Sequence, residues 1–168
     1  MDALDLKKIQ TPLKDQYRER PETALITLKA SGKISDTLSC KVETGRQWIE
    51  AGLHPATGGT GLLACSGDLL LEALVACAGV TMKAVATAIG VEITEGSIRA
   101  EGDLDFRGTL AVSKEVPVGF LSIRLYFSLL SPATPEQIKS LMQLTERYCV
   151  VYQTLSRGVP VEMILRDQ

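Results

Sequence analysis

The chain has 168 residues, 45% of them hydrophobic, and a net charge of −2, so we expect one domain over residues 1–168 with a sizeable core. No block of Lys and Arg is present, and nucleic-acid binding is therefore disfavoured, because phosphate contacts need clustered positive charge. The single histidine, His54, leaves few metal sites and few Ser-His or Cys-His catalytic pairs open.

The N-terminal region is charged. Its first residues, MDALDLKKIQ, lack the apolar core of a signal peptide, so we expect a cytoplasmic protein. In that compartment four cysteines indicate buried thiols, metal ligands or redox chemistry rather than structural disulfides. Pro12 and Pro21 interrupt residues 1–22, which we interpret as an N-terminal arm that has room for one short helix.

Two strands and a loop are predicted before residue 65. Residues 23–30 are rich in strand formers, and residues 37–44 alternate apolar and polar side chains after a turn signal at Ser31-Gly32, which predicts a β-hairpin. Cys40 falls on the apolar face, where an inert core thiol is the favoured interpretation. Residues 46–53 are predicted to form a short helix. The glycine-rich run HPATGGTG follows, and it is not a phosphate loop because no Gly-Lys-Ser/Thr comes after it.

The dominant predicted element is a helix over residues 66–90, SGDLLLEALVACAGVTMKAVATAIG. Its Leu, Ala, Val and Met residues favour helix over strand, with Ser66 as the N-cap and Gly90 as the stop. Ten consecutive uncharged residues are too few to span a bilayer, so we predict a core helix and no membrane association. Cys77 lies in its middle. Cys65 comes just before its start, where the helix dipole can lower a thiol pKa, so a third redox thiol stays open.

The second half of the chain is predicted to contain further strands. Residues 97–107 and 121–129 alternate almost without fault, which predicts two half-buried antiparallel strands, and residues 159–165 are predicted as a last strand after Gly158. The order ββ-α-ββ-α-β indicates an α+β fold, with two main helices packed on largely antiparallel sheets.

A second helix starts at Thr134-Pro135-Glu136-Gln137, with Thr as N-cap, Pro at the first helical position and Gln at the capping-box position. Apolar residues follow at spacings of three and four, and Cys149 lies on this stripe near the end of the helix.

A disulfide needs two thiols about 4 to 7 Å apart at Cα, and no cysteine pair here has the CxxC spacing. Cys77 and Cys149 lie far apart in the sequence, so only the fold could bring them together, and two helices packed on one sheet face could do that. The absence of a CxxC pair also disfavours a structural zinc site. From pattern alone, two unrelated core cysteines remain the favoured interpretation.

Two motifs nevertheless resemble those of the OsmC/Ohr family of small hydroperoxide reductases. GGTGLLACSGDLLLEALVACAGVTMKAVA is similar to the family's glycine-rich lead and its helix carrying ELLLxALxxC, with Asp68 at the Glu and Cys77 at the cysteine. LTERYCVVYQTL is similar to the late xxYCPVxxTL element, with Cys149 at the cysteine and Val150 in place of the usual Pro. The order of elements agrees over residues 23–165.

This resemblance implies an OsmC-like fold and an intertwined homodimer with two active sites at the subunit interface. It implies that Cys77 attacks an organic hydroperoxide and becomes a sulfenic acid, with which Cys149 condenses to form a disulfide. A dithiol reductant, lipoyl-type in characterised relatives, would then reset the pair by thiol–disulfide exchange, and no cofactor is expected.

The family pattern also implies an arginine in the early strand-turn region that lowers the pKa of the attacking thiol. Here that turn offers only Lys29 and Lys33, which lack the two-pronged guanidinium geometry. Arg46 is the nearest arginine, and Arg18 and Arg20 in the N-terminal arm are alternatives.

A carboxylate near the start of the central helix is expected to hold this arginine. Asp68 is one candidate, although a regular helix points it nearly opposite to Cys77, so a direct contact between the two is disfavoured. Pairing of Asp68 with an arginine, of this chain or of the partner subunit, stays open. Glu72 is the other candidate. The equal alternative is that both acids only stabilise the helix N-terminus.

Two other functions stay open at this point. One is a non-enzymatic protein of the same fold that binds a small hydrophobic ligand at the dimer interface. The other is a thiol redox sensor whose disulfide alters the binding of a partner.

Overall fold

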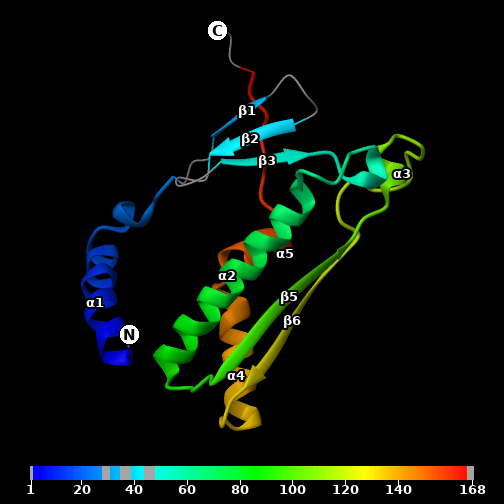
Figure 1. Cartoon of the computed structure of the whole chain (residues 1–168). Helices are drawn as coiled ribbons and strands as arrows, with labels where there is room; N and C mark the ends of the chain where they lie inside the picture. Colours follow the sequence, from blue (N-terminus) through cyan, green and yellow to red (C-terminus); the bar gives the residue numbers. More distant parts are fainter. Residues whose placement is uncertain (1, 28–30, 35–38, 44–47, 166–168) are drawn as a thin grey trace.

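Helix α2, Ser66–Ile89, runs through the middle of the molecule, and the other elements are arranged along it (Figure 1). The structure is a computed structural model that describes residues 2–27, 31–34, 39–43 and 48–165, with side chains for 2–27 and 48–165. The order of helices and strands gives the α+β class that the sequence predicts.

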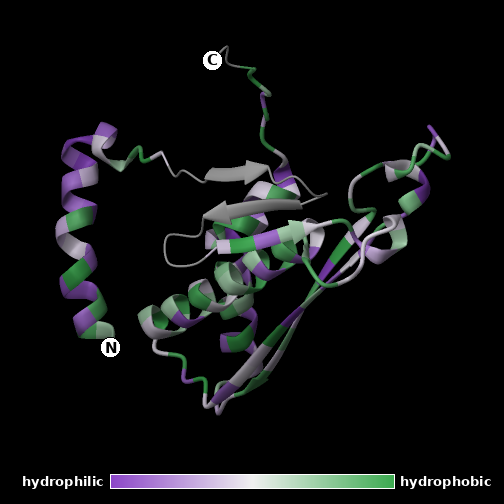
Figure 2. Ribbon diagram, turned by 45° about the horizontal axis from the view of Figure 1, so that its top comes forward, coloured by the Kyte–Doolittle hydropathy of each residue, from purple (hydrophilic) through white to green (hydrophobic). Residues whose placement is uncertain are grey.

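The central helix begins and ends at local signals. Cys65, rather than the predicted Ser66, is its N-cap, and Gly90 ends it in the left-handed conformation at φ 71°. Every fourth residue from Leu74 to Ala86 is buried, which gives the helix one fully covered stripe: Leu74, Ala78, Met82 and Ala86. Figure 2 shows that it is apolar along most of its length.

By length and composition alone α2 could cross a membrane. In the structure it packs instead against β5, α4 and α5, which makes it the central helix of a soluble domain.

Strands β5, Glu95–Asp103, and β6, Ser122–Leu130, form a long antiparallel pair along α2, which confirms the two predicted strands (Figure 1). Ile98, Ile123 and Leu125 of this pair pack against the central helix. The first strand ends earlier than predicted, because Asp105 caps a short helix, α3, Phe106–Thr109. On the solvent face Arg124 donates to the Asp103 carboxylate and, with Ser122, holds the pKa of that carboxyl below its usual range.

Helix α4, Pro135–Tyr148, starts with the predicted capping box of Thr134 and Gln137. It does not continue through Cys149. That residue has an extended backbone, φ −74° and ψ 107°, and is at once the C-cap of α4 and the N-cap of helix α5, Val150–Arg157. Both helices pack on α2.

The second sheet consists of four short strands in the order β1-β2-β3-β4: Ser31–Ile34, Ser39–Glu43, Trp48–Gly52 and Ala64–Cys65. Neighbours pair antiparallel except β3 and β4, which are parallel. The predicted helix over residues 46–53 is wrong, since its described part is β3, a strand held between two others. The predicted strand over 23–30 is also wrong in its described part, which is the end of a 3-10 helix, Pro21–Ala24, and an irregular segment.

The two ends of the chain also differ from the prediction. The N-terminal arm forms a 17-residue helix, α1, Ala3–Glu19, which is capped by Asp2 and contains Pro12. Residues 159–165 are not a strand, because no described strand lies beside them to accept their hydrogen bonds. Val161 and Leu165 in this segment are 86% and 94% exposed.

Candidate active site

The structure brings Cys77 and Cys149 together. Cys77 comes from the middle of α2 and Cys149 from the joint between α4 and α5, and both belong to one apolar cluster with Leu74 and Ala78. Cys149 is only 1% exposed, whereas Cys77 is half-buried, and both are free thiols. The more accessible sulfur is therefore the one on α2.

The break at Cys149 exposes the start of α5 to the two sulfurs. The Cys149 N–H donates to the Thr145 carbonyl at 2.9 Å, and its own carbonyl accepts from Gln153 N–H at 2.9 Å. The first N–H groups of a helix have no partner within the helix. Those of Val150 and Val151 are consequently free to donate to the Cys77 sulfur.

These donors set the charge state of Cys77. Burial raises its pKa, but hydrogen bonds from the Val151 N–H, the Cys149 thiol, the Thr81 hydroxyl and the Val150 N–H lower it, and the net pKa lies below the ordinary value. The sulfur of Cys77 thus lies at a helix N-terminus, a position that favours its anionic form.

Cys149 is shifted the other way. Burial raises the pKa of its thiol, and the hydrogen bond to Cys77 together with the negative charge there raises it further, against the lowering effect of the Tyr152 and Val151 N–H groups. Cys77 therefore loses its proton first, and the neutral Cys149 thiol donates to it. This asymmetry separates a nucleophile from a proton-bearing neighbour.

A family model described as "OsmC-like protein" matches residues 59–164 of the chain. The chain belongs to the OsmC-like family. A search of curated proteins finds no significant match.

Solved structures show the same fold at low sequence identity. An OsmC-like protein from Mycoplasma pneumoniae is 19% identical with a TM-score of 0.66, and the alignment covers 80% of this chain and 89% of the other. An organic hydroperoxide resistance protein from Elizabethkingia anophelis is 18% identical at a TM-score of 0.63, covering 80% and 90%. Another from Legionella pneumophila is 18% identical at 0.62, covering 80% and 91%.

The acidic candidates of this OsmC-like chain lie at the start of α2, away from Cys77. Asp68 and Glu72 are exposed, and Asp68 lines a hollow beside His54 and Cys65. Among residues 2–27 and 48–165, no group of three or more His, Cys, Asp or Glu side chains is placed to hold a metal ion.

None of the groups that shift the Cys77 pKa is a cation in the part of the chain with described side chains. Arg46 lies outside the described residues, as does the side chain of Lys33. Arg18 pairs with Asp15 at 2.6 Å on α1, and Arg20 is the C-cap of the same helix. The activating arginine, like the carboxylate that would hold it, stays a prediction.

Two features of the site were not predicted from the sequence. Thr81 lies four residues after Cys77, hence on the same helix face, and this spacing was a signal that could have identified it. The helix start at Val150 had no such signal, because neither Gly nor Pro marks the break between α4 and α5.

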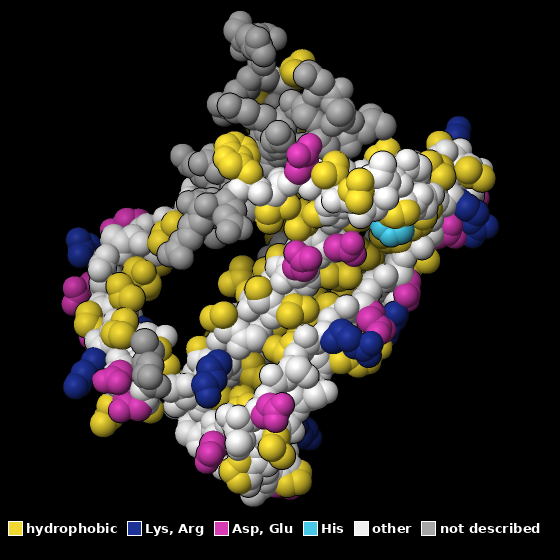
Figure 3. All heavy atoms as spheres, viewed as in Figure 1, with side chains coloured by type: hydrophobic (Ala, Val, Ile, Leu, Met, Phe, Trp, Pro, Cys, Tyr) yellow, Lys and Arg dark blue, Asp and Glu magenta, His cyan; other side chains and the backbone are white. Residues whose placement is uncertain are grey.

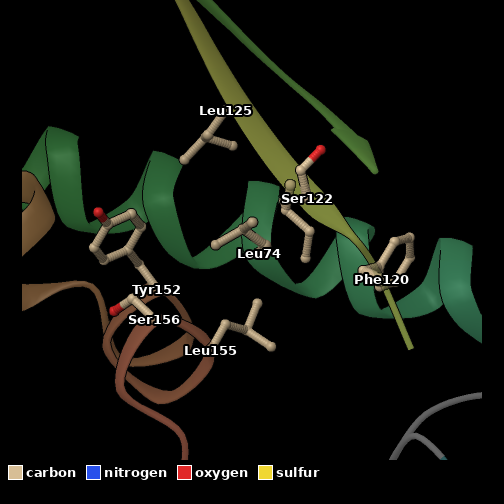
Figure 4. Close-up of a pocket in the computed structure, with 8 residues that line it drawn as sticks. Leu74, Phe120, Ser122, Leu125, Tyr152, Leu155 and Ser156 are labelled. Carbon is tan, nitrogen blue, oxygen red and sulfur yellow. The ribbon is translucent and has the colours of Figure 1, made fainter. Parts of the chain in front are cut away.

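Two hollows adjoin the site. The outer hollow, about 340 Å³, lies between α2, β6 and α5, with Leu74, Leu125, Tyr152 and Leu155 around it (Figure 4). The inner hollow, about 430 Å³, lies between β6, α4 and α5 and is lined by Ala78, Leu125, Phe127, Lys139, Met142, Gln143, Thr145, Glu146, Cys149 and Tyr152. Leu125 and Tyr152 line both, so the two are neighbours.

Thr145 in the inner hollow carries a hydroxyl without a partner. The residue is 2% exposed, and its Oγ1 has no hydrogen bond among the described residues. We expect Thr145→Val to raise the free energy of unfolding by about 1 kcal/mol, since a buried unsatisfied hydroxyl costs about 1–3 kcal/mol. Urea unfolding at fixed protein concentration measures this change.

Thr87→Val is the matched control, because the Thr87 hydroxyl donates to the Lys83 carbonyl at 2.8 Å. That variant loses a hydrogen bond and should not gain stability. A loss of stability in Thr145→Val would show that its hydroxyl has a partner in solution.

Proposed function

We propose that this OsmC-like protein reduces organic hydroperoxides in the cytoplasm, with Cys77 and Cys149 as its redox pair. The observation that carries the proposal is the asymmetry of the pair. The pKa of Cys77 is lowered at the start of α5, while its hydrogen-bonded neighbour Cys149 is buried and keeps its proton.

The chemistry takes two steps. The Cys77 thiolate attacks one oxygen of the hydroperoxide, so an S–O bond forms, the O–O bond breaks, and the alkoxide leaves with a proton as an alcohol. The Cys149 sulfur then attacks the Cys77 sulfenic acid, so a disulfide forms and water leaves. The surroundings of Cys77, which include Ile98 and Val151, are apolar and favour an alkyl hydroperoxide over hydrogen peroxide.

We further propose an intertwined homodimer with two active sites at the subunit interface. The outward side of α2 carries exposed apolar residues such as Val80, which is 74% exposed, and Figure 3 shows hydrophobic side chains gathered over this helix. Residues 159–165 are apolar except for Glu162 and pair with no described strand, as we expect of a segment that pairs with a second copy. In this proposal the activating arginine can come from the partner subunit, with Asp68 or Glu72 as its carboxylate.

Reduction of the disulfide needs an outside dithiol, for which we propose a lipoyl-type carrier. The whole chain, residues 1–168, acts as one domain in this proposal.

The test is a peroxide titration of the reduced protein, with disulfides mapped by mass spectrometry. One equivalent of cumene hydroperoxide should form a Cys77–Cys149 disulfide, and hydrogen peroxide should form it more slowly. Cys65 is the internal control. It lies at the start of α2, half the length of that helix from Cys77, so its thiol should stay out of the disulfide. Two reduced thiols at positions 77 and 149 after excess cumene hydroperoxide would rule out the enzyme and favour a ligand-binding protein.

A further inference from the structure

The inner hollow borders one cysteine of the pair and not the other. Cys149 lines it, and Cys77 is not among the described residues around it. A peroxide held there would lie beside the protonated thiol, so the hollow does not suit the first chemical step. A reagent that reacts with the sulfur of Cys149 is a better match.

Displacement at a disulfide has a preferred direction. A thiolate enters in line with the S–S bond that breaks, on the side opposite to the leaving sulfur, and forms a mixed disulfide. In the oxidised pair, the side of Cys149 away from Cys77 is the side for such an attack. The inner hollow borders Cys149 without touching Cys77, which fits that approach.

The hollow also has the lining of a binding site. Ala78, Leu125, Phe127 and Met142 provide apolar walls, and the partnerless hydroxyl of Thr145 lies among them. A buried polar atom without a partner requires an explanation, and a bound molecule that supplies an acceptor is one. Lys139, Gln143 and Glu146 are the exposed polar residues that line it.

The outer hollow extends this surface. Figure 4 shows Leu74 and Leu125 pointing into it from α2 and β6, with Tyr152 and Leu155 opposite them on α5. The hollows share Leu125 and Tyr152, so they lie next to each other along α5, and apolar residues line both.

We propose that the inner hollow admits the reductant, a thiol on an apolar chain, and directs it to the sulfur of Cys149. This inference rests on the proposed disulfide cycle. The incoming thiolate forms a mixed disulfide with Cys149, and the S–S electron pair leaves on Cys77 as a thiolate. A second thiol of the same reductant then attacks the mixed disulfide, which releases Cys149 as a thiol and the reductant as a disulfide.

The charge states agree with this direction. A thiol of lower pKa leaves faster, and the hydrogen bonds at the start of α5 lower the pKa of Cys77 while that of Cys149 is raised. Attack on Cys77 would instead have to expel the poorer leaving group.

The test uses a monothiol, which stops at the mixed disulfide. The full chain is oxidised with cumene hydroperoxide or with diamide, treated briefly with hexanethiol, quenched with N-ethylmaleimide and mapped by mass spectrometry. We expect hexanethiol on Cys149 and maleimide on Cys77. The reverse labelling would overturn the inference while leaving the proposed peroxidase intact, whereas failure of both oxidants to form the disulfide would overturn both.

Chain length and a blocking variant test the hollow itself. Hexanethiol should react at least about tenfold faster than ethanethiol, because each buried methylene favours binding by roughly fourfold. Gln143→Trp, at the rim, should remove most of this preference, while Ser140→Trp, exposed on the same helix but outside the hollow, should keep it. Equal rates for the two thiols, or equal effects of the two variants, would contradict the proposal.

Discussion

A Cys77→Ser variant is expected to consume organic hydroperoxide no faster than the protein-free reaction does. A serine hydroxyl is not ionised near neutral pH, so the donors at the start of α5 and the Thr81 hydroxyl have no thiolate to stabilise. Cumene hydroperoxide consumption in the presence of a dithiol measures this loss directly.

Cys149→Ser separates the two steps. Cys77 keeps its thiolate in this variant, so one equivalent of peroxide should be reduced, and the sulfenic acid should persist long enough to be trapped by dimedone. Turnover should stop there, because no resolving thiol is present.

Cys65→Ser is the control for both variants and should retain full turnover. Because Cys149 is buried, its serine variant also needs a thermal melt to show that the fold is intact. Full activity in Cys77→Ser would refute the proposed nucleophile, and continued turnover in Cys149→Ser would refute the proposed partner.

The ends of the long helices were predictable because the signals are local. The capping box at Thr134 and the left-handed Gly90 each depend on residues within one turn. The first N-cap was misplaced by only one residue, from Ser66 to Cys65. Strands β5 and β6 are nine residues each, which is long enough for alternation to be unambiguous.

The short strands were not predictable in the same way. Strand β3 has five residues and pairs with β2 and β4, which come from before and after it in the sequence. Its structure depends on those neighbours more than on its own propensity, and a pattern this short does not distinguish helix from strand. Residues 159–165 show the converse, since a segment predicted as a strand stays unpaired in the single chain when no described strand lies beside it.

The candidate site, too, was predictable in one part and not in another. The resemblance to a family predicted that Cys77 and Cys149 act together, and the structure places them in one cluster. The groups that lower the Cys77 pKa come partly from a helix start more than 70 residues away, and only the packing of α5 on α2 brings that start to the sulfur. Such a contact cannot be predicted from the composition of the chain or from the spacing of its residues.

Thr81→Val should move the pH dependence of the peroxide reaction to higher pH. Only the Cys77 thiolate reacts, so the rate rises as pH passes through its pKa and then levels off. The Thr81 hydroxyl helps to hold that pKa below its ordinary value, and valine keeps the shape of the side chain without the donor. The variant should therefore raise the pKa of Cys77 and leave less thiolate at any pH below the plateau.

At pH values below the wild-type midpoint we expect Thr81→Val to react roughly three- to tenfold more slowly than the wild type. This effect is small for the loss of a hydrogen bond to a charged group, because Cys77 is partly exposed and solvent screens the interaction. At the high-pH plateau the two rates should converge, since all of the Cys77 is then ionised in both proteins. Stopped-flow kinetics with cumene hydroperoxide across the pH range measures both regions.

Thr81→Ser restores the hydroxyl and should restore the wild-type profile. A rate lowered equally at every pH, or not rescued by serine, would mean that Thr81 acts through packing and that the donors at the start of α5 alone stabilise the thiolate.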